Sequence, residues 1–183
     1  AVDFIDRKKA DPFFLYLAHS SPHFPLEAPA VTRNSDLKIY REGWNKLREK
    51  RYEKQKEIGL VTDAWKFTRL SDVPVDRDDI ANQYAGKQNP EWTDLPNNRK
   101  EDLVYRMATF AAMIEHVDRG IGRIIQSLKD RGKLENTLIL FTSDNGACYE
   151  WGPFGFEGRS RQGYTKLHQG EELENVGGPG TYH

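Results

Sequence analysis

The sequence predicts an α/β protein with a parallel βαβ core and a helical, loop-rich excursion inside the crossover. Residues 12–18 and 137–143 are short, nearly continuous apolar runs, which are typical of strands buried on both faces of a parallel sheet. Residues 101–131 lie between them and have the apolar spacing of a long amphipathic helix. A strand, a helix and a second strand in this order predict a right-handed crossover between parallel strands.

Length and composition exclude several classes of protein. The 183 residues are enough for one domain. The 27 basic and 28 acidic side chains give a net charge of −1, which argues against nucleic acid or an anionic membrane as a partner. No run approaches the ~18 apolar residues of a membrane span. A single Cys excludes a disulfide framework and a cysteine-based zinc site.

The remaining elements are predicted from local patterns. Residues 2–9 resemble the end of an amphipathic helix, with Phe4 and Ile5 as its core contacts. Residues 35–58 predict a solvated surface helix, because acidic and basic side chains alternate at helical spacing. Residues 71–99 contain many Pro, Asp and Asn residues and predict a loop-rich excursion. The apolar stripe of the long helix consists of Leu103, Met107, Phe110, Ile114, Val117, Ile121, Ile124 and Leu128.

Both ends of the chain suggest a piece of a larger protein. The first helix has no N-cap residue before it, and no strand or helix is predicted after the Gly-rich tail. Two strands cannot form a stable open sheet without neighbours. We therefore expect residues 1–183 to be an internal fragment of a larger α/β domain.

Polar side chains follow both predicted strands. In open α/β sheets, ligands bind beyond the carboxyl ends of the strands. The first run leads into His19, Ser20 and His23, and the second into Asp144 and Asn145. His23 could donate a hydrogen bond or a proton to an anionic oxygen, although a histidine on a Pro-rich loop is often merely exposed. Asp144 and Asn145 offer oxygen ligands suited to Ca²⁺ or Mg²⁺, but the same sequence is compatible with a simple turn.

Four blocks of sequence extend these observations. They are residues 12–18 with 22–25, residues 43–48 with 55–61, residues 112–123, and residues 136–147. Together with the tail at 177–182 they resemble the sulfatase family, and most closely the bacterial arylsulfatases of the alkaline-phosphatase-like superfamily. The resemblance implies that the chain is part of a single sulfatase catalytic domain, truncated at both ends.

The resemblance also implies a chemistry. The parent protein is expected to cleave small-molecule or carbohydrate sulfate esters with a formylglycine and a divalent cation, Ca²⁺ in preference to Mg²⁺. Asp144 and Asn145 match the second pair of calcium ligands in the family. His23 matches the histidine that binds the sulfate group and helps to protonate the leaving oxygen. The family further implies a periplasmic or secreted protein.

The nucleophile motif of the family does not occur in this sequence. That motif is Cys or Ser, any residue, Pro, any residue, Arg, and the nearest match is residues 20–24, where Phe24 replaces the arginine. Cys148 also lacks the motif. We expect the formylglycine and an acidic pair before residue 1 and a sulfate-binding lysine after His183, so the isolated chain should be inactive. The alternatives are a phosphonate or phosphodiester hydrolase of the same superfamily, or a non-catalytic binding module.

Overall fold

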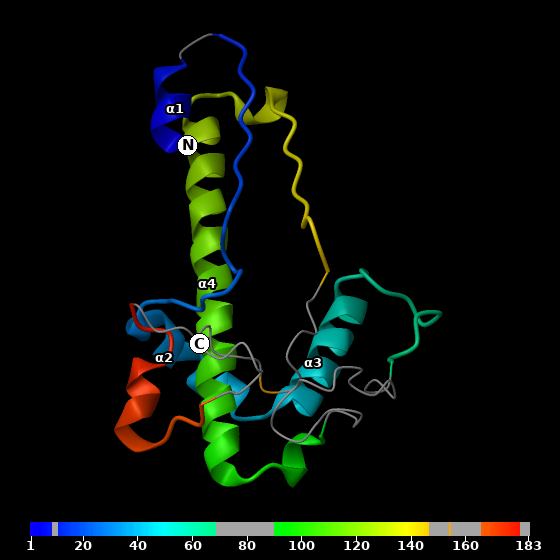
Figure 1. The fold of residues 1–183 in the computed structure, drawn as a ribbon. Helices are drawn as coiled ribbons and strands as arrows, with labels where there is room; N and C mark the ends of the chain where they lie inside the picture. Colours follow the sequence, from blue (N-terminus) through cyan, green and yellow to red (C-terminus); the bar gives the residue numbers. More distant parts are fainter. Residues whose placement is uncertain (9–10, 69–89, 147–153, 155–165, 180–183) are drawn as a thin grey trace.

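A long helix forms the axis around which the other elements are arranged (Figure 1). The computed structural model describes residues 1–8, 11–68, 90–146, 154 and 166–179. The α-helices of these residues are α1 (Val2–Arg7), α2 (Ala30–Tyr40), α3 (Trp44–Glu57) and α4 (Asn97–Asp130). Short 3-10 helices are η1 (Trp92–Asp94), η2 (Leu134–Asn136) and η3 (Gly170–Asn175).

Helix α4 confirms the long helix predicted from the apolar stripe, but its buried face is rotated. Leu103 and Leu128 are buried as expected, whereas Phe110 and Ile114 in the middle of the stripe are 42% and 45% exposed. The middle of the helix instead buries a flank that includes small alanines, which allow α2 to approach closely. The core around this contact contains Leu37, Trp92, Leu95, Leu103, Val104, Tyr105, Ala108, Phe154 and Val176.

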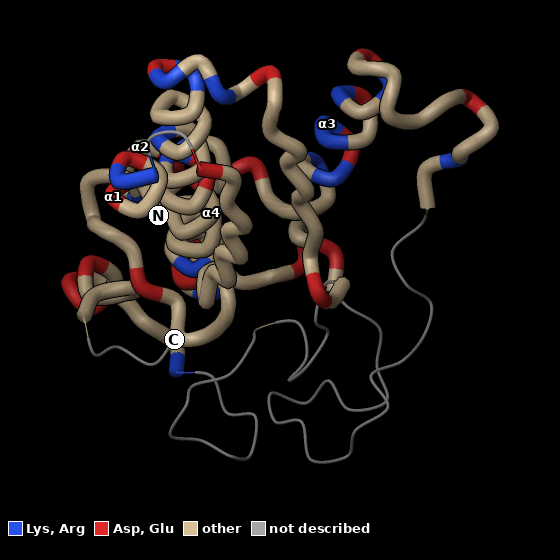
Figure 2. Tube along the Cα trace, turned by 90° about the horizontal axis from the view of Figure 1, so that it is seen from above, with Lys and Arg blue, Asp and Glu red and all other residues tan. Residues whose placement is uncertain are grey.

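The predicted helix over residues 35–58 is two helices in the structure. Gly43 separates α2 from α3 with a φ of +82°, and a Cβ there would lie 2.3 Å from the Trp92 ring. Only glycine tolerates both the left-handed backbone and this close approach. Helix α3 buries no residue, which confirms the predicted surface helix, and acidic residues are interspersed among more numerous basic ones along it (Figure 2).

Helix α1 confirms the short amphipathic helix predicted at the beginning of the chain. Ile5 is completely buried where α1 packs against the C-terminal end of α4. The Asp6 carboxylate accepts hydrogen bonds of 2.9 Å from Ser127 Oγ and from Arg131 Nε. These two bonds hold the pKa of Asp6 below its ordinary value. Apolar burial and charge therefore both hold α1 in place.

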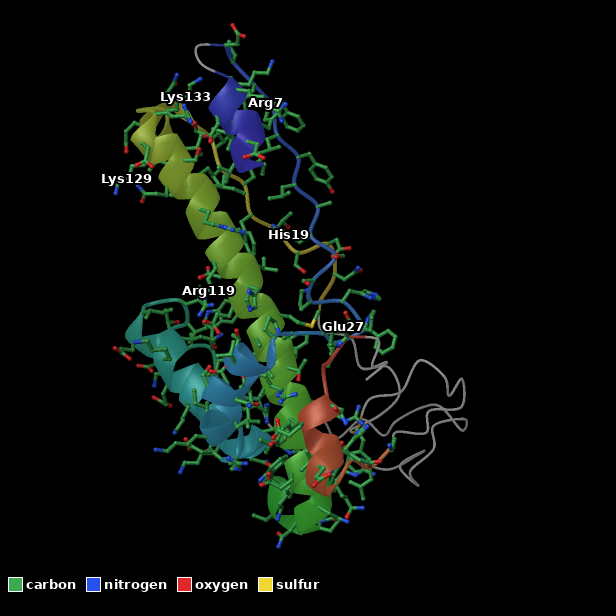
Figure 3. All side chains as sticks on the ribbon, turned by 90° about the vertical axis from the view of Figure 1, so that its left-hand side faces the viewer. Arg7, His19, Glu27, Arg119, Lys129 and Lys133 are labelled. Atoms are coloured by element: carbon green, nitrogen blue, oxygen red, sulfur yellow. The ribbon has the colours of Figure 1, made fainter. Side chains whose placement is uncertain are left out.

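The two predicted strands are not formed in the residues that the structure describes. Residues 12–18 and 137–143 have no ladder pairing, and Phe14 and Leu140 are 86% and 84% exposed. A buried parallel strand needs hydrogen-bonded neighbours and cover on both faces, and the described part of the chain provides neither. The parallel βαβ core is therefore not confirmed. Both segments nevertheless run in the same direction along α4, away from the end that packs on α1 (Figures 1 and 3).

Within the described ranges, every helix is either too short or too polar to cross a lipid bilayer.

Candidate functional site

The loop from residue 19 to residue 28, here called the His23 loop, orients the predicted catalytic histidine by local hydrogen bonds. The His23 N–H donates to the Ser20 carbonyl at 3.0 Å, which closes a turn. His23 Nδ1 lies 2.8 Å from the Phe24 carbonyl oxygen. Because a carbonyl can only accept, Nδ1 carries the hydrogen of this bond. The ring is exposed, and Nε2 remains as its second polar atom. Figure 3 labels His19 and Glu27 near the two ends of this loop.

Asp144 and Asn145 lie in a bend at the end of the second extended segment. The Ser143 hydroxyl donates to the Asn145 carbonyl at 2.7 Å, so a turn is present, as one of the two interpretations predicted. Both side chains are exposed, and within the described residues neither makes a hydrogen bond. Their carboxylate and amide oxygens are therefore available as ligands, and the turn is compatible with the cation site as well.

The structure does not join the two halves of the predicted site. No hydrogen bond links His23 to Asp144 or Asn145 across the part of the chain that is described. The described residues also contain no cluster of three or more His, Cys, Asp or Glu side chains that could hold a metal ion. Convergence of the two halves stays a prediction, supported by the common direction of the two extended segments (Figure 1). Cys148 lies outside the described residues.

Comparison with known proteins identifies the family. The profile of the sulfatase family matches residues 1–175. The chain belongs to the sulfatase family. It is 37% identical over 142 residues to an uncharacterized sulfatase of Schizosaccharomyces pombe, covering 78% of this chain and 23% of that protein. It is 30% identical over 139 residues to an arylsulfatase of Klebsiella aerogenes, covering 76% of this chain and 26% of that one. The sulfatase chain thus spans about a quarter of the length of these relatives.

Sequence reasoning missed a polar cluster between α2, α4 and η3 of this sulfatase chain, in which Arg33 and Tyr105 are buried and the Glu174 side chain is 58% exposed. Arg33 on α2 is 1% exposed and forms a 2.9 Å ion pair with Glu174. The Tyr105 hydroxyl donates to the other oxygen of Glu174 at 2.9 Å. Burial and this hydrogen bond raise the pKa of Tyr105. The available signal was helical spacing, because Arg33 lies four positions before the buried Leu37 on the same face of α2.

A second buried cluster holds the segment before η3 against α4. Asp102 Oδ2 accepts hydrogen bonds from Arg99 at 3.0 Å and Arg106 at 3.1 Å. Asp102 Oδ1 lies 2.8 Å from His168 Nδ1. Arg106 also donates to the Lys166 carbonyl at 2.8 Å. The two carboxylate oxygens are thus shared between helical arginines and the incoming segment, which fixes residues 166–168.

Proposed function

We propose that this chain is an internal part of a larger sulfatase that hydrolyses sulfate esters. In that enzyme it contributes one proton-donating histidine and two oxygen ligands of a cation site. The family match over residues 1–175 is the observation that carries the proposal. The two extended segments run in the same direction (Figure 1), and if they pair as parallel strands in the parent protein, the residues that follow them would lie at one edge of the sheet.

His23 is the proposed proton donor to the leaving oxygen. Its Nδ1–H is committed to the Phe24 carbonyl, which fixes the ring and leaves Nε2 for the substrate. When the ring is protonated, Nε2–H donates to the ester oxygen and transfers its proton as the sulfur–oxygen bond breaks. An oxygen nucleophile forms a new bond to sulfur as the ester bond breaks, so the alcohol leaves neutral and, after hydrolysis, sulfate is the other product. Proton donation matters most for poor leaving groups, because these develop the largest negative charge.

Asp144 and Asn145 would hold a divalent cation, with Ca²⁺ as the proposed ion. Their donor chemistry fits, since Ca²⁺ prefers carboxylate and amide oxygens and accepts about six to eight of them. The exposed bend provides two such side chains, so the remaining ligands must come from other parts of the parent protein. The ion, when bound, would neutralise charge on the sulfate oxygens. The formylglycine nucleophile is likewise proposed to come from outside residues 1–183.

The proposed substrates are aryl or carbohydrate sulfate esters. The Klebsiella aerogenes relative is named an arylsulfatase. A human relative, 38% identical over 60 residues that cover 32% of this chain and 11% of that protein, is named an N-sulphoglucosamine sulphohydrolase. Both names denote hydrolytic release of sulfate, but N-sulphoglucosamine carries its sulfo group on nitrogen, so the human relative supports a sugar as the carrier and not the ester bond. We propose export from the cytoplasm as well, which fractionation of the producing cells can test.

The experiment is an assay of the intact parent protein on 4-nitrophenyl sulfate, with 4-nitrophenyl phosphate and an aryl phosphonate as comparisons. We expect sulfate hydrolysis that falls on Ca²⁺ removal, and a kcat about 10²-fold lower in His23→Ala. The isolated chain should be inactive. Faster hydrolysis of the phosphate or phosphonate ester would favour the related hydrolases. Turnover by the isolated chain would contradict the proposal that the nucleophile and the remaining cation ligands lie outside residues 1–183.

A further inference from the structure

Within the described residues, the hydrogen bonds of His23 stay inside the His23 loop, so the position of the ring depends on how the loop is attached to the rest of the chain. His23 contacts Ser20 and Phe24 through its backbone N–H and its Nδ1 atom. The loop is joined to the rest of the chain at its far end, where the Ala28 N–H donates to the Gly177 carbonyl at 3.0 Å. Whatever fixes Gly177 therefore helps to fix the frame that carries His23.

Gly177 is fixed first by close packing against α4. Its φ is +76°, and a Cβ on it would lie 2.4 Å from Cγ2 and 2.7 Å from Oγ1 of Thr109. The preceding Val176 is completely buried in the core beside α4. The backbone of this segment thus lies against the helix at a distance that only glycine permits.

Arg33 fixes the same segment from the side of α2. Its Nη1 donates to the carbonyl oxygens of Glu174 and Val176, and its Nη2 pairs with the Glu174 carboxylate. A buried guanidinium is costly unless its donors are satisfied, and here Asn34 accepts from Nε while Glu174 and Val176 accept from the two Nη atoms. The planar fork makes this geometry specific to arginine.

Helix α4 adds the third contact through Tyr105. Its hydroxyl donates to Glu174, and its ring lies under the Arg33 guanidinium with 5.0 Å between the guanidinium carbon and the ring centroid. The Glu174 carboxylate is therefore bonded once from α2 and once from α4. The segment with η3 lies beside both helices in Figure 1.

These contacts connect the His23 loop, α2 and residues 174–177 to one another. The His23 loop continues through Ala28 and Pro29 into α2, whose first turn carries Arg33. Arg33 holds residues 174–176, and the next residue, Gly177, accepts the hydrogen bond of Ala28. The C-terminal covalent connection of the loop and its hydrogen bond to Gly177 therefore both lead to Arg33.

We infer that Arg33, Tyr105 and Glu174 form a latch that positions the His23 loop, and that they are positioning residues for proton donation by His23. The inference rests on the proposed function of His23. Loss of the latch should shift the imidazole relative to the ester oxygen without removing any group that touches the substrate. A misplacement of about 1 Å can cost up to about 100-fold in rate.

The test compares Arg33→Lys with Arg106→Lys in the intact parent protein. Arg106 is a matched control, because it is also a buried arginine, and its described hydrogen bonds go to Asp102, Lys166 and His168 rather than to residues 174–177. Each variant is made with and without His23→Ala. The kcat is measured on 4-nitrophenyl sulfate and on phenyl sulfate, which has the poorer leaving group.

We expect Arg33→Lys to lower kcat on phenyl sulfate about tenfold or more, with a smaller loss on 4-nitrophenyl sulfate. In the His23→Ala background the same change should have little further effect, because the group it positions is already gone. Arg106→Lys should change both substrates equally and with the same factor in both backgrounds. If Arg33→Lys does not fold, Tyr105→Phe removes one hydroxyl and should give the same pattern with a loss of about threefold.

Two results overturn the inference in distinguishable ways. If His23→Ala lowers kcat but Arg33→Lys and Tyr105→Phe act by the same factor with and without His23, or have no effect, the latch does not position the histidine. If His23→Ala itself leaves kcat unchanged on both substrates, the proposed role of His23 fails, and the positioning role fails with it.

Discussion

Replacing Gly177 with alanine should open the junction between the His23 loop and η3. The residue has a φ of +76°, and a non-glycine residue in the left-handed region costs about 1–2 kcal/mol. The new Cβ would also lie 2.4 Å from Thr109 Cγ2, and overpacking of this kind costs about 1–3 kcal/mol. Together the two effects should lower the free energy of opening by about 2–5 kcal/mol.

Hydrogen exchange of the Ala28 amide measures this opening directly, because that amide donates to Gly177. A loss of 2 kcal/mol or more speeds exchange about 30-fold or more, since about 1.4 kcal/mol is a factor of ten. The double variant Gly177→Ala with Thr109→Ala removes both atoms nearest to the new Cβ and should recover the overpacking part of the loss. The peptide of residues 124–133 at the far end of α4 serves as the control and should be unchanged.

The reasoning would be refuted if the Ala28 amide exchanged at its original rate in Gly177→Ala. It would also be refuted if the double variant recovered nothing, because the clash with Thr109 would then not contribute. Exchange that sped up equally at residues 124–133 would indicate global destabilisation instead of a local opening.

Three further predictions concern the fold. Because Ser127 and Arg131 lower the pKa of Asp6, their stabilisation of α1 is present above the ordinary value of 3.8 and is lost as the pH falls through the lowered pKa. Exchange protection of α1, corrected for the intrinsic rate, should therefore fall below about pH 4, and Asp6→Asn should abolish this dependence. Gly43→Ala should weaken the near-ultraviolet circular dichroism of the Trp44–Trp92 pair, because the new Cβ would occupy the position of the Trp92 ring; an unchanged spectrum would contradict the packing. Leu140→Lys should change the stability of the isolated chain by less than about 0.5 kcal/mol, but that of the intact parent by about 3 kcal/mol or more, as measured by denaturant unfolding. Equal effects in both would show that residues 137–143 are not buried in the parent.

The helices could be predicted because their signals are local. The periodic apolar residues of α4 and the alternating charges of α3 are visible in single windows of sequence. The boundary at Gly43 was missed because it depends on Trp92, which lies far away in the sequence. The rotated buried face of α4 has the same kind of cause, since α2 decides which flank of the helix is covered.

The two predicted strands are absent from the described residues for a different physical reason. An apolar run indicates that a segment can be buried, but a strand also needs partners that satisfy its backbone groups. Among the described residues, the segments 12–18 and 137–143 are extended and largely exposed. Their hydrophobicity therefore indicates that other segments cover them in the parent protein, more reliably than it indicates strand structure in this chain. The relatives are about three times as long as this chain, which leaves ample sequence to supply those partners.

The residues of the candidate site also fall into two groups, those that local sequence identifies and those that only the folded chain identifies. His23, Asp144 and Asn145 could be selected by residue type and by the family resemblance, and their mutual placement stays a prediction. Arg33 was not selected, because an arginine in a polar stretch of sequence suggests a solvated side chain, and its helical spacing to Leu37 is a weak signal by itself. Its role depends on Glu174 and Tyr105, and only the folded chain brings these three residues together.

The most direct measurement is a crystal structure of the intact parent protein with Ca²⁺ and inorganic sulfate. We expect a Ca²⁺ ion about 2.4 Å from side-chain oxygens of Asp144 and Asn145. A sulfate oxygen should lie about 3 Å from His23 Nε2, with another oxygen of the same sulfate on the ion. A structure with His23 on one face of the protein and the Asp144–Asn145 bend on another would contradict the shared site.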